Sequence, residues 1–80
     1  MPFYRKRPVV IEAVQFDGDN FEEVLELLGE IVINTGDNTL SISTLEGDMR
    51  ANIGDWIIKG VASEGYPCRN DVFLRTYEPA

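Results

Sequence analysis

Histidine is absent from this 80-residue chain, and cysteine occurs once, at Cys68. One cysteine excludes a disulfide within the chain, and with it a disulfide-stabilised secreted scaffold. The usual ligands of a structural zinc site are missing too. Without histidine a cysteine enzyme lacks its usual base, so we expect Cys68 to be buried and inert. We therefore predict no metal, no cofactor and no catalytic residue, and we predict that the protein is not an enzyme.

Long apolar runs are also absent, because no stretch approaches the roughly 20 residues that a membrane span requires. Arg5, Lys6 and Arg7, followed by apolar residues, give the start of the chain some likeness to a signal peptide. Glu12 interrupts that apolar stretch, however, and no cleavage site of small residues follows it. We expect no membrane association and a reducing, cytoplasmic setting.

Basic residues are scarce: 7 lysines and arginines stand against 14 aspartates and glutamates, a net charge of −7. Three of the seven are Arg5, Lys6 and Arg7, which leaves 4 basic and 14 acidic residues from Pro8 onward, a balance of −10. Such a body repels nucleic acid, so direct nucleic-acid binding is not expected. The simplest role of the charge is solubility. The alternative is an acidic surface that engages a basic groove on a partner protein.

A chain of this length is expected to form one domain, residues 1–80. Residues Val9–Phe16 carry apolar side chains on both faces, which predicts a central strand covered on both sides. Helical spacing of apolar residues predicts an amphipathic helix over Phe21–Leu28. The side chain of Asp19 or Asn20 is expected to cap this helix, and Gly29 to end it. Its apolar stripe consists of Phe21, Val24, Leu25 and Leu28.

The middle of the chain predicts a hairpin between residues 40–45 and 49–53. A two-residue turn at Glu46-Gly47 would pair Ile42 with Ala51 and Leu40 with Ile53, apolar against apolar. Further strands are expected at Ile31–Asn34 and Trp56–Ile58, and a short edge strand at Tyr66–Cys68, since proline cannot donate to a ladder. Asn70 or Asp71 is expected to cap a last helical turn.

These elements predict an α+β fold. The expected architecture is a small, strongly curved, antiparallel-rich sheet or half-barrel with one packed amphipathic helix and a short C-terminal helical turn.

Five residues are candidates for binding. Trp56, Tyr66 and Tyr77 are of the types that dominate interface hot spots, although a domain this small also needs large side chains in its core. Arg50 lies on the polar face of the hairpin, which could hold a small polar ligand or a protein surface. Asp55, on the bend after Gly54, could act as a base or ligand, but an aspartate there more often accepts bonds from nearby backbone amides.

Several segments resemble a family of small proteins encoded by bacteriophages and prophages. They are VVIEAVQF at residues 9–16, GDWIIKGV at 54–61, YPC at 66–68, Phe73, and TYE at 76–78. The likeness covers both ends and about half of the chain. Ile53 stands where that family usually has proline, and Arg69-Asn70-Asp71 where it usually has lysine-proline-aspartate. The resemblance implies a phage origin and a cytoplasmic setting in the bacterial host, and it supplies no active site.

Taken together, these features predict an interaction protein that binds a host or phage protein, and that inhibits a host or defence protein by covering its surface. The alternative is a module that binds or sequesters a small polar molecule. Self-association into a homo-oligomer is compatible with both, through edge strands near Ile31 or Tyr66.

Overall fold

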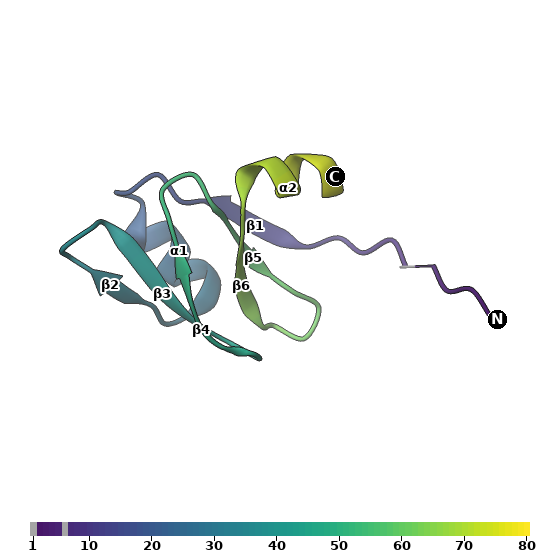
Figure 1. Ribbon diagram of the computed structural model, residues 1–80, viewed down its shortest axis with the longest axis horizontal. Coiled ribbons are helices and arrows are strands. Elements are labelled where there is room, and N and C mark those ends of the chain that lie inside the picture. Colours follow the sequence, from purple (N-terminus) through teal and green to yellow (C-terminus); the bar gives the residue numbers. More distant parts are fainter. Residues whose placement is uncertain (1, 6) are drawn as a thin grey trace.

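The computed structural model describes residues 2–5 and 7–80 of the chain. In these residues six strands and two helices follow one another in the order β-α-β-β-β-β-β-α (Figure 1). The predicted α+β class and the predicted order of elements are confirmed. The elements are β1 (Glu12–Gln15), α1 (Phe21–Leu28), β2 (Val32–Asn34), β3 (Thr39–Thr44), β4 (Gly47–Ala51), β5 (Trp56–Lys59), β6 (Gly65–Cys68) and α2 (Asn70–Thr76).

The strands form two antiparallel sheets of three, in the orders β1-β5-β6 and β2-β3-β4. The strong curvature predicted for a single sheet is therefore not confirmed. The chain passes from one sheet to the other at the bend between β4 and β5. There Gly54 adopts a positive φ of 96°, and the amide of Asp55 donates to the carbonyl of Asn52 at 3.0 Å. The bend therefore ends the pairing of β4 with β3 before the pairing of β5 in the other sheet begins.

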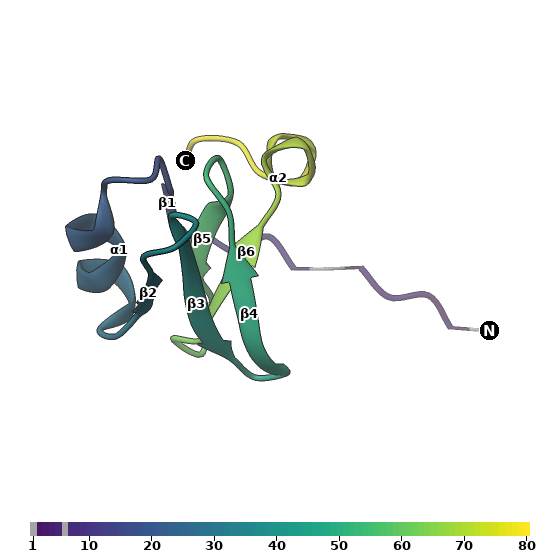
Figure 2. The same cartoon turned by 60° about the vertical axis from the view of Figure 1, so that its left-hand side comes forward.

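The core lies between the two sheets and α1, whose arrangement the turned view shows (Figure 2). Its fully buried side chains come from β3, β4, β5, α1 and the residue that follows β1. Ile58 is buried as well, on the opposite face of β5 from Ile57. Two neighbouring residues of one strand can both be buried only if that strand is covered on both faces. The core residues are Phe16, Val24, Leu40, Ile42, Ala51 and Ile57.

β5, not β1, is the central strand of its sheet, so the prediction of a central strand over Val9–Phe16 was wrong. β1 is the outer strand and begins only at Glu12, which pairs with Lys59, the last residue of β5. Residues before Glu12 have no further β5 residue to pair with, because the chain turns away at Gly60. The predicted cover on both faces is also not found at Val9 and Val10, which are 45% and 80% exposed. The length of β1 depends on that of its neighbour β5.

Helix α1 spans Phe21–Leu28 as predicted, and Gly29 ends it with a φ of 86°. The predicted side-chain cap is not formed. Instead the Asp17 carboxylate accepts the amides of Asp19 and Asn20 at 2.8 and 2.9 Å. The Asn20 side chain turns back, donating to the Gln15 carbonyl at 2.8 Å and accepting from the Asp17 amide at 2.8 Å. The polar residues before α1 thus fix the turn rather than the helix end.

The apolar stripe of α1 is also displaced by part of a turn. Val24 is fully buried, and Phe21 and Leu28 pack against the core as predicted. Leu25, however, is 45% exposed, and Leu27, which was not assigned to the stripe, packs inward in its place.

The hairpin of β3 and β4 has the predicted faces but a register shifted by two residues. Ile42 pairs with Met49 and Leu40 with Ala51, so the turn residues are Leu45 and Glu46. Gly47 follows the turn with a φ of 110°, a conformation that glycine adopts readily. Because the shift is even, Leu40, Ile42 and Ala51 still point into the core.

At the C-terminal end, β6 is an edge strand as predicted, and α2 is longer than the single turn expected. Neither Asn70 nor Asp71 caps α2, whose N-cap is Arg69. The Asp71 carboxylate instead binds the Arg69 guanidinium, with Nη2 to Oδ2 at 2.6 Å and Nε to Oδ1 at 3.1 Å.

The described residues before Ile11, which are residues 2–5 and 7–10, form an N-terminal arm that leads away from the body (Figures 1 and 2). Its side chains are exposed, Phe3 by 95% and Tyr4 by 92%.

Candidate binding groove

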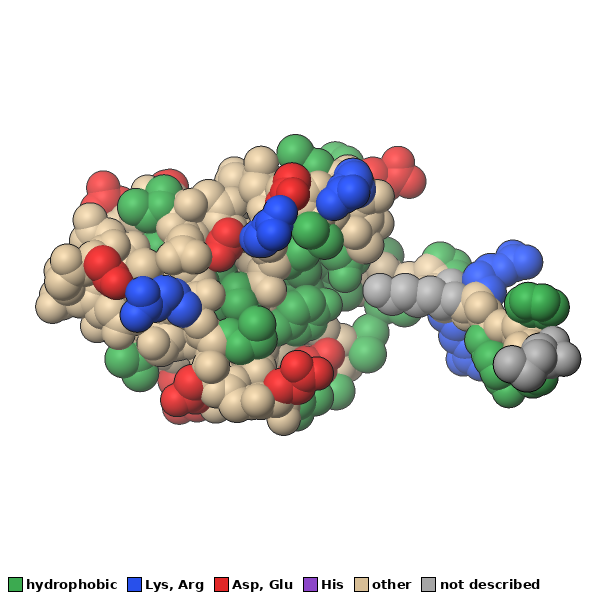
Figure 3. All heavy atoms as spheres, viewed as in Figure 1, with side chains coloured by type: hydrophobic (Ala, Val, Ile, Leu, Met, Phe, Trp, Pro, Cys, Tyr) green, Lys and Arg blue, Asp and Glu red, His purple; other side chains and the backbone are tan. Residues whose placement is uncertain are grey.

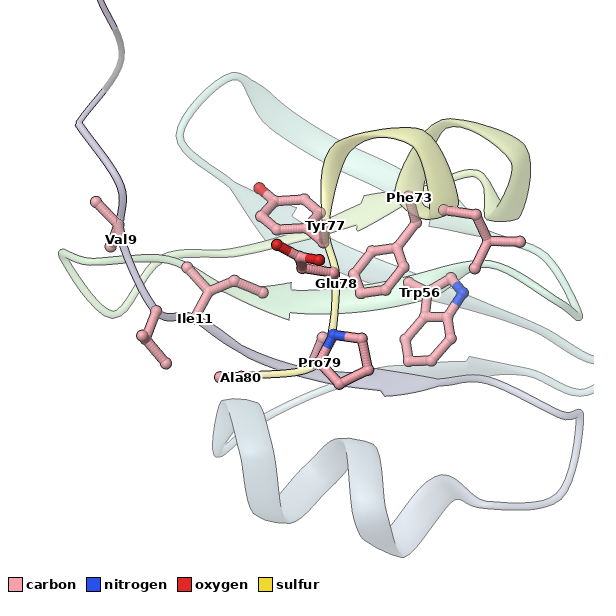
Figure 4. A pocket seen from close by; sticks show the side chains of 11 residues that line it. Val9, Ile11, Trp56, Phe73, Tyr77, Glu78, Pro79 and Ala80 are labelled. Atoms are coloured by element: carbon pink, nitrogen blue, oxygen red, sulfur yellow. The ribbon is translucent and has the colours of Figure 1, made fainter.

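A groove runs between α2, the C-terminal residues 78–80 and the segment that leads into β1 (Figure 4). We call it the α2 groove. Its volume is about 480 Å³, which lies within the usual range of small-molecule and side-chain pockets. The lining is mostly apolar and consists of Val9, Val10, Ile11, Ala13, Trp56, Phe73, Leu74, Tyr77, Glu78, Pro79 and Ala80.

Three aromatic rings form one wall of the α2 groove. The Trp56 and Phe73 rings are stacked, with centroids 4.1 Å apart and an interplanar angle of 6°. Tyr77 lies one helical turn after Phe73, and its ring is tilted by 31° at 5.0 Å. None of the three rings is fully buried, and Leu74 beside them is 64% exposed. The wall therefore presents a continuous aromatic surface to the groove (Figure 4).

One side-chain amide holds this wall in place. Asn70, the first residue of α2, accepts a hydrogen bond at Oδ1 from Trp56 Nε1 at 2.9 Å and from Gln15 Nε2 at 3.3 Å. Gln15 Nε2 also lies 3.1 Å from the Gly54 carbonyl. These bonds tie α2 to β5 and β1. No residue of α2 is buried, so these bonds and the ring stack carry much of its attachment to the body.

Behind the aromatic wall, the hydroxyl groups of Tyr77 and Tyr66 lie 3.5 Å apart. The contact with Tyr77, together with burial, raises the pKa of Tyr66 to about 12. Both effects favour the protonated phenol over the phenolate. Tyr66 is therefore neutral under ordinary conditions and acts as a hydrogen-bonding group.

The Tyr66 pKa leads to a pH prediction. In the unfolded chain Tyr66 loses its proton near pH 10, whereas the folded protein keeps it up to about 12. As pH rises through this interval the unfolded state releases a proton that the folded state retains, so the free energy of unfolding falls. In Tyr77→Phe the Tyr66 pKa should move toward 10, and the decline should be shallower. Tyrosinate absorbance and urea unfolding across this pH range measure both effects, and an unchanged Tyr66 titration in the variant would contradict them.

The structure brings together three of the five residues proposed from the sequence. Trp56 and Tyr77 line the α2 groove, and Tyr66 adjoins it through the Tyr77 hydroxyl. Arg50 is on β4, in the other sheet, where Nη1 lies 3.3 Å from Asp37 Oδ2 in an exposed ion pair. Asp55 Oδ2 accepts the backbone amide of Asn52 at 2.9 Å, as the structural interpretation of that bend predicted.

Sequence reasoning missed Phe73, Leu74, the residues before β1 and the last three residues as parts of one site. The available signal was the spacing of Phe73 and Tyr77, which are four residues apart, the interval that brings two side chains together along one helical turn.

Cys68 is half-buried rather than fully buried. Burial raises the pKa of its thiol, and the negative charges of Asp55 and Asp71 raise it further. A raised pKa keeps the sulfur protonated and unreactive, in line with the inert role expected for it.

A second, smaller hollow of about 380 Å³ is lined by residues of the β3–β4 hairpin and of β6. Its lining includes the apolar residues Leu45, Met49, Tyr66 and Pro67 and the acidic residues Glu46 and Glu64. Figure 3 shows apolar side chains gathered over this part of the molecule, with acidic groups below them.

Comparison of the chain with protein-family models, curated proteins and solved structures finds no match. The resemblance to phage proteins therefore stays a prediction. In residues 2–5 and 7–80, no three cysteine or carboxylate side chains gather closely enough to hold a metal ion. No helix in the described part of the chain is long and apolar enough to cross a membrane.

Proposed function

We propose that this chain is a small, acidic, phage-type binding protein of the bacterial cytoplasm, and that a host or phage protein places an apolar segment in its α2 groove. One observation carries the proposal: Trp56, Phe73 and Tyr77 form an aromatic wall on one side of a groove of about 480 Å³. Aromatic residues in such a position supply most of the binding energy at protein interfaces. Covering a partner's working surface in this way would inhibit that partner.

The composition of the groove favours binding over catalysis. Its lining includes two ionisable side chains, Tyr77 and Glu78, among mostly apolar neighbours. General acid–base chemistry needs groups whose pKa values are matched to the reaction, positioned against the substrate. An apolar wall with one carboxylate side chain at its edge is better suited to an apolar segment flanked by a basic residue.

The negative charge of the protein favours a partner with a basic surface. Beyond the N-terminal basic residues, the chain carries a balance of −10. A negative field of this kind speeds association with a basic surface and weakens as salt is added. Binding to the proposed partner should therefore combine an apolar anchor with a salt-sensitive association rate.

The volume of the α2 groove also supports the second candidate function, a small-molecule-binding module. Pockets that hold small ligands are usually mostly apolar and of this size. In that case the protein should carry a small added mass, and its affinity should respond little to salt.

The test is recovery of the tagged protein from its native host, followed by native mass spectrometry of wild type and two variants. Leu74→Asp places a charge in the groove at a residue that is 64% exposed. Val32→Asp is the matched control, since Val32 is 61% exposed and lies on β2 in the other sheet. We expect a protein complex that Leu74→Asp weakens at least about tenfold, roughly 1.4 kcal/mol, and that the control leaves intact.

Other outcomes are equally informative. Equal loss with both variants, or no effect of Leu74→Asp, would place the binding surface outside the α2 groove. A small added mass lost only in Leu74→Asp would replace the protein partner with a small ligand.

A further inference from the structure

β1 is the outermost strand of its sheet, and its outer edge is open over most of its length. The order β1-β5-β6 gives β1 one neighbour, β5. An outer strand presents backbone N–H and C=O groups that can pair with another chain. β2, β4 and β6 are outer strands as well. β6, however, contains Pro67, which has no N–H to donate.

The hydrogen bonds show which residues of β1 face outward. The Phe16 amide donates to the Asp55 carbonyl at 2.9 Å, so the backbone of Phe16 faces β5. In an antiparallel pair this orientation alternates, so Val14 and Glu12 also face β5, whereas Ala13 and Gln15 face away. The Gln15 carbonyl agrees with this assignment, because it accepts Asn20 Nδ2 instead of a β5 amide.

The same alternation continues toward the arm. The Asn20 side chain already occupies the outward carbonyl of Gln15. The outward backbone groups that remain belong to Ala13, Ile11 and Val9. Within residues 2–5 and 7–80, no backbone hydrogen bond joins these three residues to another strand on that side. Pro8 falls on the inward-facing positions, so its missing N–H removes no outward donor.

The arm itself is apolar and exposed. Phe3 is 95%, Tyr4 92% and Val10 80% exposed, and Val9 is 45% exposed. So many large apolar side chains in one short segment indicate a surface that becomes covered. Val9 and Val10 border the α2 groove, but the outer part of the arm leads away from its own body, which leaves Phe3 and Tyr4 uncovered (Figures 1 and 2).

The charges of the arm and of the body favour a second copy of this chain as the surface that covers the arm. Arg5 and Arg7 make the arm basic, whereas the chain from Pro8 onward carries a balance of −10. An arm that crosses to a second copy of this chain brings its positive charges to the acidic body of that copy.

We propose that two copies of this chain pair through the outer edges of β1 and the N-terminal arms, antiparallel about a two-fold axis near Val9 and Ile11. The two sheets then form one six-stranded sheet in the order β6-β5-β1-β1-β5-β6. The contact is self-complementary, because each copy gives its arm to the other and receives one. The dimer uses the outer backbone edge of Val9 and Ile11, which also line the α2 groove, so the arm of the second copy borders that groove.

The first test compares two proline variants of the full chain by sedimentation equilibrium. Wild type should have twice the chain mass of 9.0 kDa at micromolar concentrations. Ile11→Pro removes an outward N–H and should raise the dimer dissociation constant at least about tenfold. Val10→Pro is the matched control for the backbone, since the Val10 amide faces inward, and should weaken the dimer far less than Ile11→Pro does. Circular dichroism melts verify that both variants fold.

Amide exchange gives a second readout that does not depend on a variant. In wild type the amides of Val9 and Ile11 should be protected at high concentration and exposed on dilution, while Val10 exchanges rapidly throughout. A wild-type protein that stays monomeric to about a hundred micromolar would overturn the proposal, which expects a dimer at micromolar concentrations. Equal exchange at positions 9, 10 and 11 would overturn it too. Leu74→Asp should leave the dimer unchanged, which separates this test from that of the α2 groove.

Discussion

Replacing Phe16 with alanine is expected to lower the free energy of unfolding by about 3–5 kcal/mol. The Phe16 side chain is fully buried where β1, α1 and the two sheets meet, and its ring lies 5.6 Å from that of Phe21. Alanine would remove the whole ring and leave a cavity in a core of few residues. An 80-residue domain has a total stability of roughly 4–12 kcal/mol, so a large share of the variant molecules should be unfolded.

Urea unfolding followed by circular dichroism measures this loss. Leu45→Ala is the control, because Leu45 is 84% exposed at the hairpin turn and its truncation should change stability by less than about 0.5 kcal/mol. A loss below about 1 kcal/mol in Phe16→Ala would mean that the core does not depend on this ring.

Replacing Trp56 with alanine is expected to release α2 while the β2-β3-β4 sheet stays folded. The change removes the ring stack with Phe73 and the hydrogen bond to Asn70. For a half-buried tryptophan the loss should be about 2–3 kcal/mol. Because α2 has no buried residue of its own, most of this loss should appear as local opening.

Hydrogen exchange at the amides of Phe73 and Tyr77 should accelerate roughly 30- to 100-fold in Trp56→Ala. Both amides belong to the α2 ladder, donating to Arg69 and Phe73 at 2.8 and 2.9 Å. Trp56→Phe keeps a stacking ring and loses only the N–H donor, so it should cost about 1 kcal/mol. If exchange in β3 rises as much as in α2, the helix and the sheets unfold together and the prediction fails.

Local patterns in the sequence predicted most elements because they depend on few neighbours. The apolar stripe on α1 and the end of the helix at Gly29 depend only on residues that are a few positions apart in the sequence. The faces of the β3–β4 hairpin followed from alternation alone, whereas its register depended on where Gly47 could take a positive φ. A two-residue shift preserves every face, so alternation could not distinguish the two registers.

Features set by distant contacts could not be predicted. The length of β1 depends on where β5 ends, and the open edge of β1 depends on which strand is central. The candidate site was predicted by residue type for Trp56, Tyr66 and Tyr77. Their assembly around Phe73 required the position of α2, which Asn70 fixes through Trp56 and Gln15.

The single tryptophan of the chain forms part of the aromatic wall of the α2 groove, stacked on Phe73 at 4.1 Å. The protein therefore carries its own optical reporter at this position. Any molecule that enters the groove changes the polarity and the mobility around the indole, so the intrinsic fluorescence spectrum registers occupancy without a label. The same signal follows the undocking of α2, and quenching by iodide distinguishes a covered indole from a released one.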